Sequence, residues 1–92
     1  MSGLAKLKKE LTEKSSLSVE QETIRNVITG KIYEIMREDN VTESRLASKL
    51  KVSTKFVKLL LSGDKNFDID LLTEILYVLN RKIHITFNKS YQ

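Results

Sequence analysis

The sequence contains neither cysteine nor proline, and glycine occurs only three times. Without cysteine, the chain has no disulfide framework and no thiolate metal site. The absence of proline and the scarcity of glycine favour helices over a turn-rich β fold. No segment approaches the roughly 18 apolar residues of a membrane-spanning helix, and no apolar run of signal-peptide length follows Met1. We therefore expect a soluble, cytoplasmic protein with no membrane contact.

Residues that would support catalysis are also scarce. The single histidine, His84, has no acidic cluster near it at metal-ligand spacing. The sequence has no Gly-x-Ser-x-Gly elbow and no glycine-rich phosphate loop. Asp68 and Asp70 are better explained as first-turn residues that complement a helix dipole. We predict that the protein is not an enzyme and that it holds no metal and no cofactor.

Charge is distributed unevenly along the 92 residues, whose formal net charge is +4. Residues 41–66 hold six basic and two acidic residues, whereas basic and acidic residues balance in 1–40 and in 67–92. A local basic patch attracts polyanions through counterion release, whereas an even distribution mainly aids solubility. Chance clustering in a short chain is the alternative explanation.

The N-terminal part of the chain is expected to form two helices. An amphipathic helix is predicted within residues 1–17 from three leucines at helical spacing, Leu4, Leu7 and Leu11. Serines at positions 15 and 16 are expected to end it. Ser18 then caps a second helix that reaches about residue 38. Gly30 weakens the middle of this helix and is expected to mark a close packing point.

Three further helices are expected to follow. Thr42 caps a short helix over residues 43–50. After a tight connection, a second short helix starts at Ser53 or Thr54 and runs to about residue 62, where Gly63 is the expected stop. Asp68 caps the last helix, and Asn80 can end it in a left-handed conformation.

The C-terminal tail changes to strand periodicity. Ile83, Ile85 and Phe87 alternate with polar residues, which predicts a strand with one apolar face. A lone strand leaves its backbone groups unpaired, so we expect it to pair with the same strand of a second copy in a two-fold dimer. A tail packed irregularly on its own domain is the alternative.

The predicted fold is therefore mainly α, with about five helices and one C-terminal strand that pairs across a dimer. The chain is long enough for one small domain, and a domain this small gains stability from a partner. Its expected parts are an N-terminal helix, a helical core and a dimerising tail, at residues 1–17, 18–80 and 81–92.

The two short helices have the proportions of a helix-turn-helix over residues 43–62. Ala47 is the small residue expected where the two helices cross. Five aliphatic residues are expected in the core of this unit: Leu46, Leu50, Val52, Val57 and Leu60. In such modules the N-terminal part of the second helix enters the major groove of DNA.

The residues left facing outward are the candidate DNA contacts. Lys55 or Lys58 can reach guanine O6 and N7, and Thr54 can bond either base type. Loop residues would hold backbone phosphates, which position the protein without specifying sequence. The complete candidate set is Arg45, Ser53, Thr54, Lys55, Lys58, Leu59, Ser62, Lys65 and Asn66.

The run LASKLKVSTKFVKLLLSGDKN, followed by LLTEILYVLN, resembles the lambda-repressor-like (Cro, XRE) helix-turn-helix family over about residues 41–80. The C-terminal RKIHITF is similar to the HigA-type antitoxin branch, in which a longer N-terminal helical part is also common. Three positions depart from the family pattern. Lys51 replaces the usual turn glycine, Glu43 replaces a phosphate-binding glutamine, and Leu59 stands at an often polar, base-facing position.

These features predict a sequence-specific double-stranded DNA-binding transcriptional regulator. We expect a repressor that acts as a homodimer on an inverted-repeat operator. The alternative is an antitoxin that binds a protein toxin through residues 1–40 and autoregulates its operon. The N-terminal leucines would otherwise cover the domain core or extend the dimer interface. A third hypothesis is a helix-turn-helix frame that has lost DNA binding, because of Glu43 and Leu59.

Overall fold

A computed structural model describes residues 2–63 and 66–89 of the protein, with side chains from residue 16 onward. The described chain is all-helical and contains no strand. Its four helices are α1 (Ser2–Glu38), α2 (Glu43–Leu50), α3 (Thr54–Leu61) and α4 (Ile69–Val78). None of these helices, over the residues that are described, is long and apolar enough to cross a membrane.

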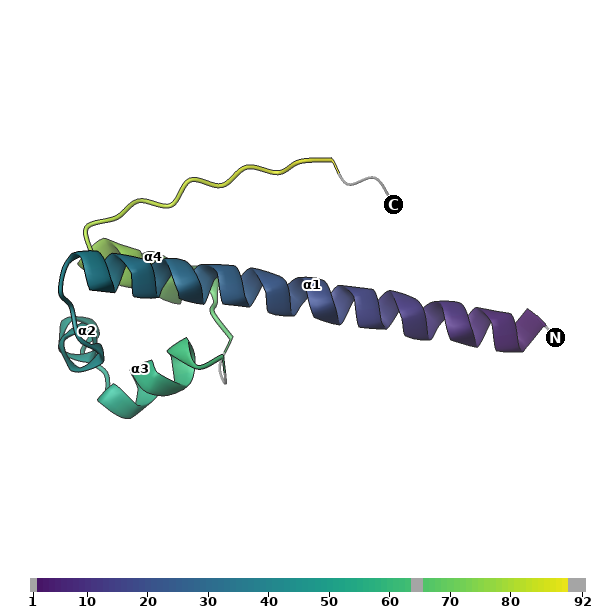
Figure 1. Ribbon diagram of the computed structural model, residues 1–92, viewed down its shortest axis with the longest axis horizontal. Helices are drawn as coiled ribbons and strands as arrows, with labels where there is room; N and C mark the ends of the chain where they lie inside the picture. Colours follow the sequence, from purple (N-terminus) through teal and green to yellow (C-terminus); the bar gives the residue numbers. More distant parts are fainter. Residues whose placement is uncertain (1, 64–65, 90–92) are drawn as a thin grey trace.

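The first two predicted helices are in fact one continuous helix, α1, so the predicted break at Ser15-Ser16 and the cap at Ser18 are wrong. Serine is only a moderately poor helix former, and no proline is present to interrupt the backbone hydrogen bonds. Gly30 is not a packing point either, because a Cβ added there meets no atom within 4 Å. Figure 1 shows the N-terminal half of α1 extending well beyond the other helices.

The caps predicted at Thr42 and Asp68 are confirmed, and Ser53 caps the helix between them. The hydroxyl oxygen of Thr42 accepts a hydrogen bond from the backbone N–H of Arg45 at 3.1 Å. The Ser53 hydroxyl accepts one from the N–H of Phe56 at 3.0 Å, and the Asp68 carboxylate accepts one from the N–H of Leu71 at 2.6 Å. Each bond satisfies a backbone donor that the first turn of a helix leaves unpaired.

The chain reverses direction after α1, α2 and α4 at residues with left-handed backbone geometry. Asn40, Lys51 and Asn80 have φ angles of 54°, 60° and 59°. Asparagine tolerates this conformation better than most residues, whereas lysine pays a cost of about 1 kcal/mol relative to glycine. Gly63, beyond the C-terminal end of α3, also has positive φ, as its predicted role as a helix stop requires.

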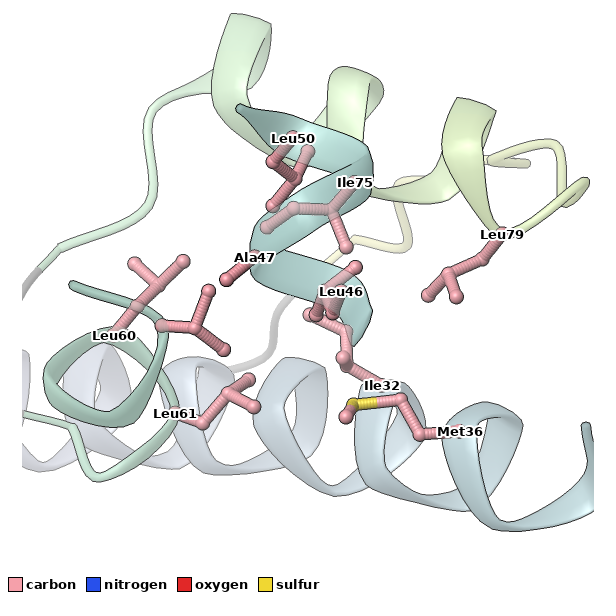
Figure 2. Packing of buried hydrophobic residues seen from close by; sticks show 10 residues of the cluster. Ile32, Met36, Leu46, Ala47, Leu50, Leu60, Leu61, Ile75 and Leu79 are labelled. Carbon is pink, nitrogen blue, oxygen red and sulfur yellow. The ribbon is translucent and has the colours of Figure 1, made fainter. Parts of the chain in front are cut away.

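The core lies where the C-terminal half of α1 packs against α2, α3 and α4 (Figure 2). Ten side chains are buried there: Ile32, Met36, Leu46, Ala47, Leu50, Val57, Leu60, Leu61, Ile75 and Leu79. Val52, which was expected in this core, is 37% exposed. Its N–H donates to the Ala47 carbonyl at 3.0 Å, which holds Val52 in the turn at the edge of the core. We call residues 25–38 with α2, α3 and α4 the compact unit.

The predicted C-terminal strand is not formed within the single chain. Residues 81–89, which we call the tail, leave α4 as an extended segment that runs back along the direction of α1 (Figure 1). A strand needs a hydrogen-bonded neighbour, and no described segment of the same chain provides one. Ile83, Ile85 and Phe87 are all exposed, Phe87 by 93%.

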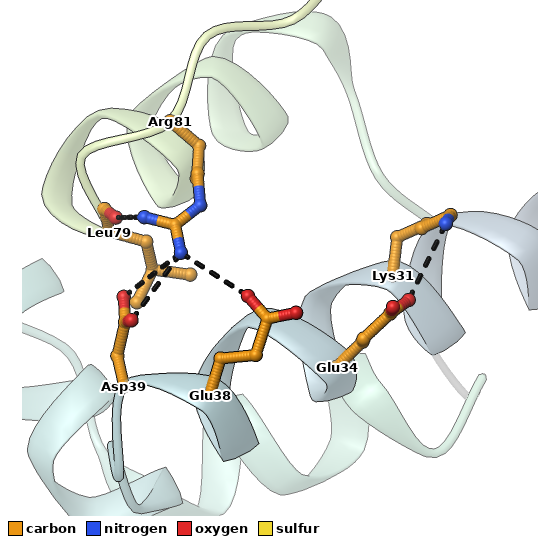
Figure 3. A network of polar contacts seen from close by, with 6 residues as sticks. All are labelled: Lys31, Glu34, Glu38, Asp39, Leu79 and Arg81. Atoms are coloured by element: carbon orange, nitrogen blue, oxygen red, sulfur yellow. Dashed lines mark hydrogen bonds and ion pairs between the residues drawn. The ribbon is translucent and has the colours of Figure 1, made fainter.

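The base of the tail is fastened to α1 by one arginine (Figure 3). The Arg81 guanidinium lies 3.5 Å from a Glu38 carboxylate oxygen and 3.3 Å from an Asp39 carboxylate oxygen. It also donates to the Leu79 carbonyl at 3.1 Å, and its backbone N–H donates to the Leu76 carbonyl at 2.8 Å. These contacts fix where the tail leaves the compact unit.

The molecule is elongated as a result. Its radius of gyration is 17.4 Å, and its principal extents are 58, 29 and 21 Å. A compact chain of this length has a radius of gyration of about 12 Å. The N-terminal half of α1 and the tail account for the difference, since both project from the compact unit (Figure 1).

Candidate nucleic-acid interface

Helix α3 has two chemically distinct faces. Val57, Leu60 and Leu61 are buried in the core. Lys55 and Lys58 are exposed and lie on the opposite side of the helix. The buried face anchors the helix in the core and leaves the ammonium groups of Lys55 and Lys58 in solvent. Helix α3 therefore presents a positively charged surface.

The N-terminal end of α3 is held in a defined geometry by Ser53. Its side chain accepts the N–H of Phe56, and Phe56 itself is half-buried against the core. Thr54, the first residue of the helix, is half-buried. Free N–H groups and the helix dipole make such an end compatible with a phosphate. The Ser53 side chain is already engaged in capping α3, whereas the half-buried Thr54 lies at the edge of the exposed face.

Leu59 and Ser62 lie toward the C-terminal end of the same outward face. Leu59 is half-buried, so part of its side chain remains accessible for an apolar contact. The Ser62 hydroxyl donates to the Leu59 carbonyl at 2.9 Å. This bond uses the hydroxyl proton of Ser62, which limits that side chain to accepting hydrogen bonds from another molecule.

The loop before α4 is tied to α1 by a bond that the sequence did not reveal. The Arg25 guanidinium donates to the side-chain carbonyl oxygen of Asn66 at 2.8 Å. These residues are 41 positions apart, and no periodic pattern links them. Asn66 is therefore positioned by α1, whereas Lys65, its neighbour in the candidate set, lies outside the described residues.

Helix α2 and the following turn also carry exposed basic residues, of which Lys49 lines a hollow with α4 and the base of the tail. They are Arg45, Lys49 and Lys51, and all three are exposed. The acidic residue closest in sequence is Glu43, at the first position of α2, which is half-buried beside α1. The positive charge predicted for this part of the sequence thus lies at the surface of the folded chain.

Glu43 faces a hollow between α1 and α2 that Tyr33 and Arg37 also line. Burial raises the pKa of the Tyr33 hydroxyl, and the negative charge of Glu43 raises it further. Tyr33 therefore stays neutral at physiological pH and can act as a hydrogen-bond donor. The Glu43 carboxylate remains a source of repulsion for any phosphate at this end of α2.

Comparison of the chain with models of protein families, with curated proteins and with solved structures found no match in any of the three. Within the described ranges, no three histidine or acidic side chains lie together in a way that would hold a metal ion. The geometry and charge of α2 and α3 are therefore the observations from which a function is inferred.

Proposed function

We propose that the protein is a sequence-specific double-stranded DNA-binding transcriptional regulator that acts as a repressor. The observation that carries this proposal is α3, a helix anchored by one buried face with Lys55 and Lys58 exposed on the other. It follows α2 after a connection of three residues, which is the proportion of a helix-turn-helix. The sequence resemblance to the lambda-repressor-like family supports the same function.

In the proposed complex, the N-terminal part of α3 enters the major groove. Lys55 and Lys58 donate to guanine O6 and N7, and Thr54 bonds a base edge at the rim. Arg45 and Asn66 contact backbone phosphates, which set the orientation of the protein on the duplex. The partly exposed Leu59 packs against a thymine methyl group. Glu43 weakens phosphate binding at the start of α2.

The proposed active form is a homodimer joined through the tail. The three apolar residues of the tail are exposed in the single chain, and its backbone has no strand partner among the described residues. Two tails paired antiparallel about Ile85 would place Ile83 of each copy opposite Phe87 of the other, on one face. A two-fold dimer then presents its α3 helices to two half-sites about 34 Å apart.

The proposal is tested by selecting binding sites from random duplex DNA and measuring affinity at several salt concentrations. Lys55→Ala and Lys58→Ala should each weaken binding by about 1–3 kcal/mol if the lysine contacts a base. If the lysine contacts a phosphate instead, the salt slope should fall by about one. The matched control is Lys31→Ala, an exposed lysine on α1. Unchanged affinity and salt slope in both α3 variants would contradict the proposal.

A second candidate function is that of an antitoxin which binds a protein toxin through residues 1–40. The observation that favours it is the N-terminal half of α1, which projects from the compact unit without a partner in the described chain (Figure 1). An amphipathic helix of this kind can occupy a groove on another protein. Co-expression with the product of an adjacent toxin-like reading frame tests it, and a free homogeneous dimer under those conditions counts against it.

A further inference from the structure

A hollow opens where the loop before α4 meets α1. Its volume is about 420 Å³, and the described residues that line it are Gln21, Ile24, Arg25, Asn66 and Phe67. Gln21, Ile24 and Arg25 belong to α1, whereas Asn66 and Phe67 belong to the loop. The hydrogen bond between Arg25 and Asn66 joins these two sides. The shape of the hollow is therefore maintained by two of its own lining residues.

The bond between Arg25 and Asn66 determines which polar atoms remain available to a ligand. A guanidinium group can only donate hydrogen bonds, so the amide of Asn66 must turn its oxygen toward Arg25. That oxygen accepts from the guanidinium at 2.8 Å. The Nδ2 group of Asn66 and the remaining N–H groups of Arg25 are all donors. The group that suits them is rich in acceptors and negatively charged, as a phosphate is.

Arg25 also keeps its positive charge, in contrast to Arg81. Both arginines fasten a later segment of the chain to α1. The charge of Arg81 is compensated by Glu38 and Asp39, which lie 3.5 and 3.3 Å from its guanidinium. Arg25 instead bonds a neutral amide, and it forms no ion pair with any carboxylate among the described residues. A carboxylate at position 66 would also bond Arg25 but would cancel its charge.

The acidic residues nearest in sequence do not fill this role from the sides. Glu20 and Glu22 are exposed on α1, but neither of them lines the hollow. The carboxylate of Asp68, just beyond the loop, is engaged in capping α4. Among the described residues, the lining thus contains one cationic side chain and no acidic one. The electrostatic environment inside the hollow favours an anion.

The rest of the lining suits the carbon atoms of a sugar. Ile24 is 56% exposed, and Phe67 is half-buried against the core, so both offer apolar surface at the hollow. Gln21, one helical turn before Arg25, adds a second side-chain amide. A sugar-phosphate unit combines an acceptor-rich anion with an apolar carbon ring. The lining therefore matches the backbone of a nucleic acid in both respects.

The hollow lies close enough to α3 for one duplex to contact both. The chain from Leu61, at the end of α3, to Asn66 spans at most about 18 Å when it is fully extended. The major groove of B-DNA is about 12 Å wide, and a phosphate strand borders it on each side. Figure 1 shows the segment between α3 and α4 passing beside α1, where Arg25 holds it. A strand that borders α3 is thus within reach of the hollow.

We propose that Arg25 and Asn66 together bind one phosphate of the DNA backbone, so that α1 forms part of the DNA interface. The inference rests on the proposed function and adds a contact from a helix outside the helix-turn-helix. Arg25 both positions Asn66 and donates to the same phosphate. Phosphate contacts are independent of base sequence, so this contact should add affinity on any duplex.

Substitution of Arg25 tests the contact in the full chain. Arg25→Ala should weaken binding about tenfold, on the selected site and on a scrambled duplex alike, and should lower the salt slope by about one. Arg25→Lys retains the charge and should recover most of the slope. The matched control is Lys31→Ala, which also removes one positive charge from α1 and should change affinity by less than about twofold.

Asn66→Asp separates phosphate binding from a merely structural role. The new carboxylate can pair with Arg25, so the loop stays fastened and the unfolding temperature should not fall. DNA affinity should nevertheless fall about tenfold or more, because the charge of Arg25 is cancelled and the phosphate is repelled. Asn66→Ala leaves the charge of Arg25 in place and should cost less, about threefold in affinity.

The possible outcomes separate this inference from the proposed function. Unchanged affinity and salt slope in Arg25→Ala, while the α3 lysine variants weaken binding, overturn this inference alone. A lower unfolding temperature in Arg25→Ala with an unchanged salt slope overturns it too, since the role of Arg25 is then structural. If the Arg25 and Asn66 variants weaken binding while Lys55→Ala and Lys58→Ala do not, the phosphate site stands and recognition by α3 is contradicted. A protein that binds no duplex contradicts both.

Discussion

The compact unit and the two projecting segments, which are the N-terminal half of α1 and the tail, differ in how much tertiary packing supports them. In the compact unit, ten buried apolar side chains hold the helices together, and each position is set by its neighbours. Residues 16–24 of α1 and 82–89 of the tail have helical and extended backbones, respectively, and their side chains are exposed. Local periodicity was sufficient to predict the helices of the compact unit. It did not predict that Ser2–Glu38 forms one continuous helix, or that the tail has no strand partner among the described residues.

The largest expected difference between the two regions is in the free energy of unfolding when an apolar side chain of α1 is replaced by alanine. Ile32→Ala should lower the free energy of unfolding by about 2–5 kcal/mol, because Ile32 is fully buried and its truncation leaves a cavity. Val19→Ala, on the projecting half of the same helix, should change it by less than about 0.5 kcal/mol. Urea unfolding followed by circular dichroism measures both. Similar losses would show that the two halves of α1 are not energetically distinct.

Glycine substitutions should show a smaller effect of opposite sign at two positions. Gly30→Ala should stabilise the protein by about 1 kcal/mol, because alanine is the better helix former and its Cβ meets no neighbouring atom. Gly63→Ala should destabilise it by about 1 kcal/mol, because the φ of 91° is unfavourable for a residue with a Cβ. Thermal unfolding of both variants is the measurement. A loss of stability in Gly30→Ala would indicate a contact at that position.

The smallest expected effect concerns the join between the compact unit and the tail. Arg81→Gln removes the ion pairs to Glu38 and Asp39 and should cost about 0.5–1 kcal/mol at low salt. Salt should reduce this difference, since partly exposed ion pairs are screened. Lys31→Gln, which breaks the exposed pair with Glu34, is the control and should cost less. A salt-independent loss in Arg81→Gln would point to packing of its side chain instead.

Several features of the fold were predictable because they depend on neighbours in sequence. Thr42 and Asp68 were identified as helix caps because a capping side chain bonds a backbone group only three residues away. The left-handed end at Asn80 is local in the same sense. The burial of Leu46, Leu50, Val57 and Leu60 followed from helical spacing alone.

Other features could not be predicted, because they depend on distant parts of the chain or on weak local preferences. The break expected at Ser15-Ser16 is wrong, since two serines lower helix stability only slightly within a long helix. Val52 was placed in the core by its apolar character, although the turn holds it at the surface. The bond between Arg25 and Asn66 joins two parts of the chain without any sequence signal. Within the candidate site, the exposure of Lys55 and Lys58 was predictable from the sequence. The capping bond of Ser53 and the bond from the Ser62 hydroxyl to the Leu59 carbonyl could be seen only in the structure.

The sequence by itself determined helices α2, α3 and α4, the approximate positions of their ends, and the exposure of Lys55 and Lys58. These properties depend on interactions within a few residues, which a single sequence displays directly. Tertiary structure decided that α1 is one helix extending past the compact unit, and that Arg81 fastens the tail beside its C-terminal end. It also decided which apolar residues remain uncovered, because burial depends on what the rest of the chain brings near them.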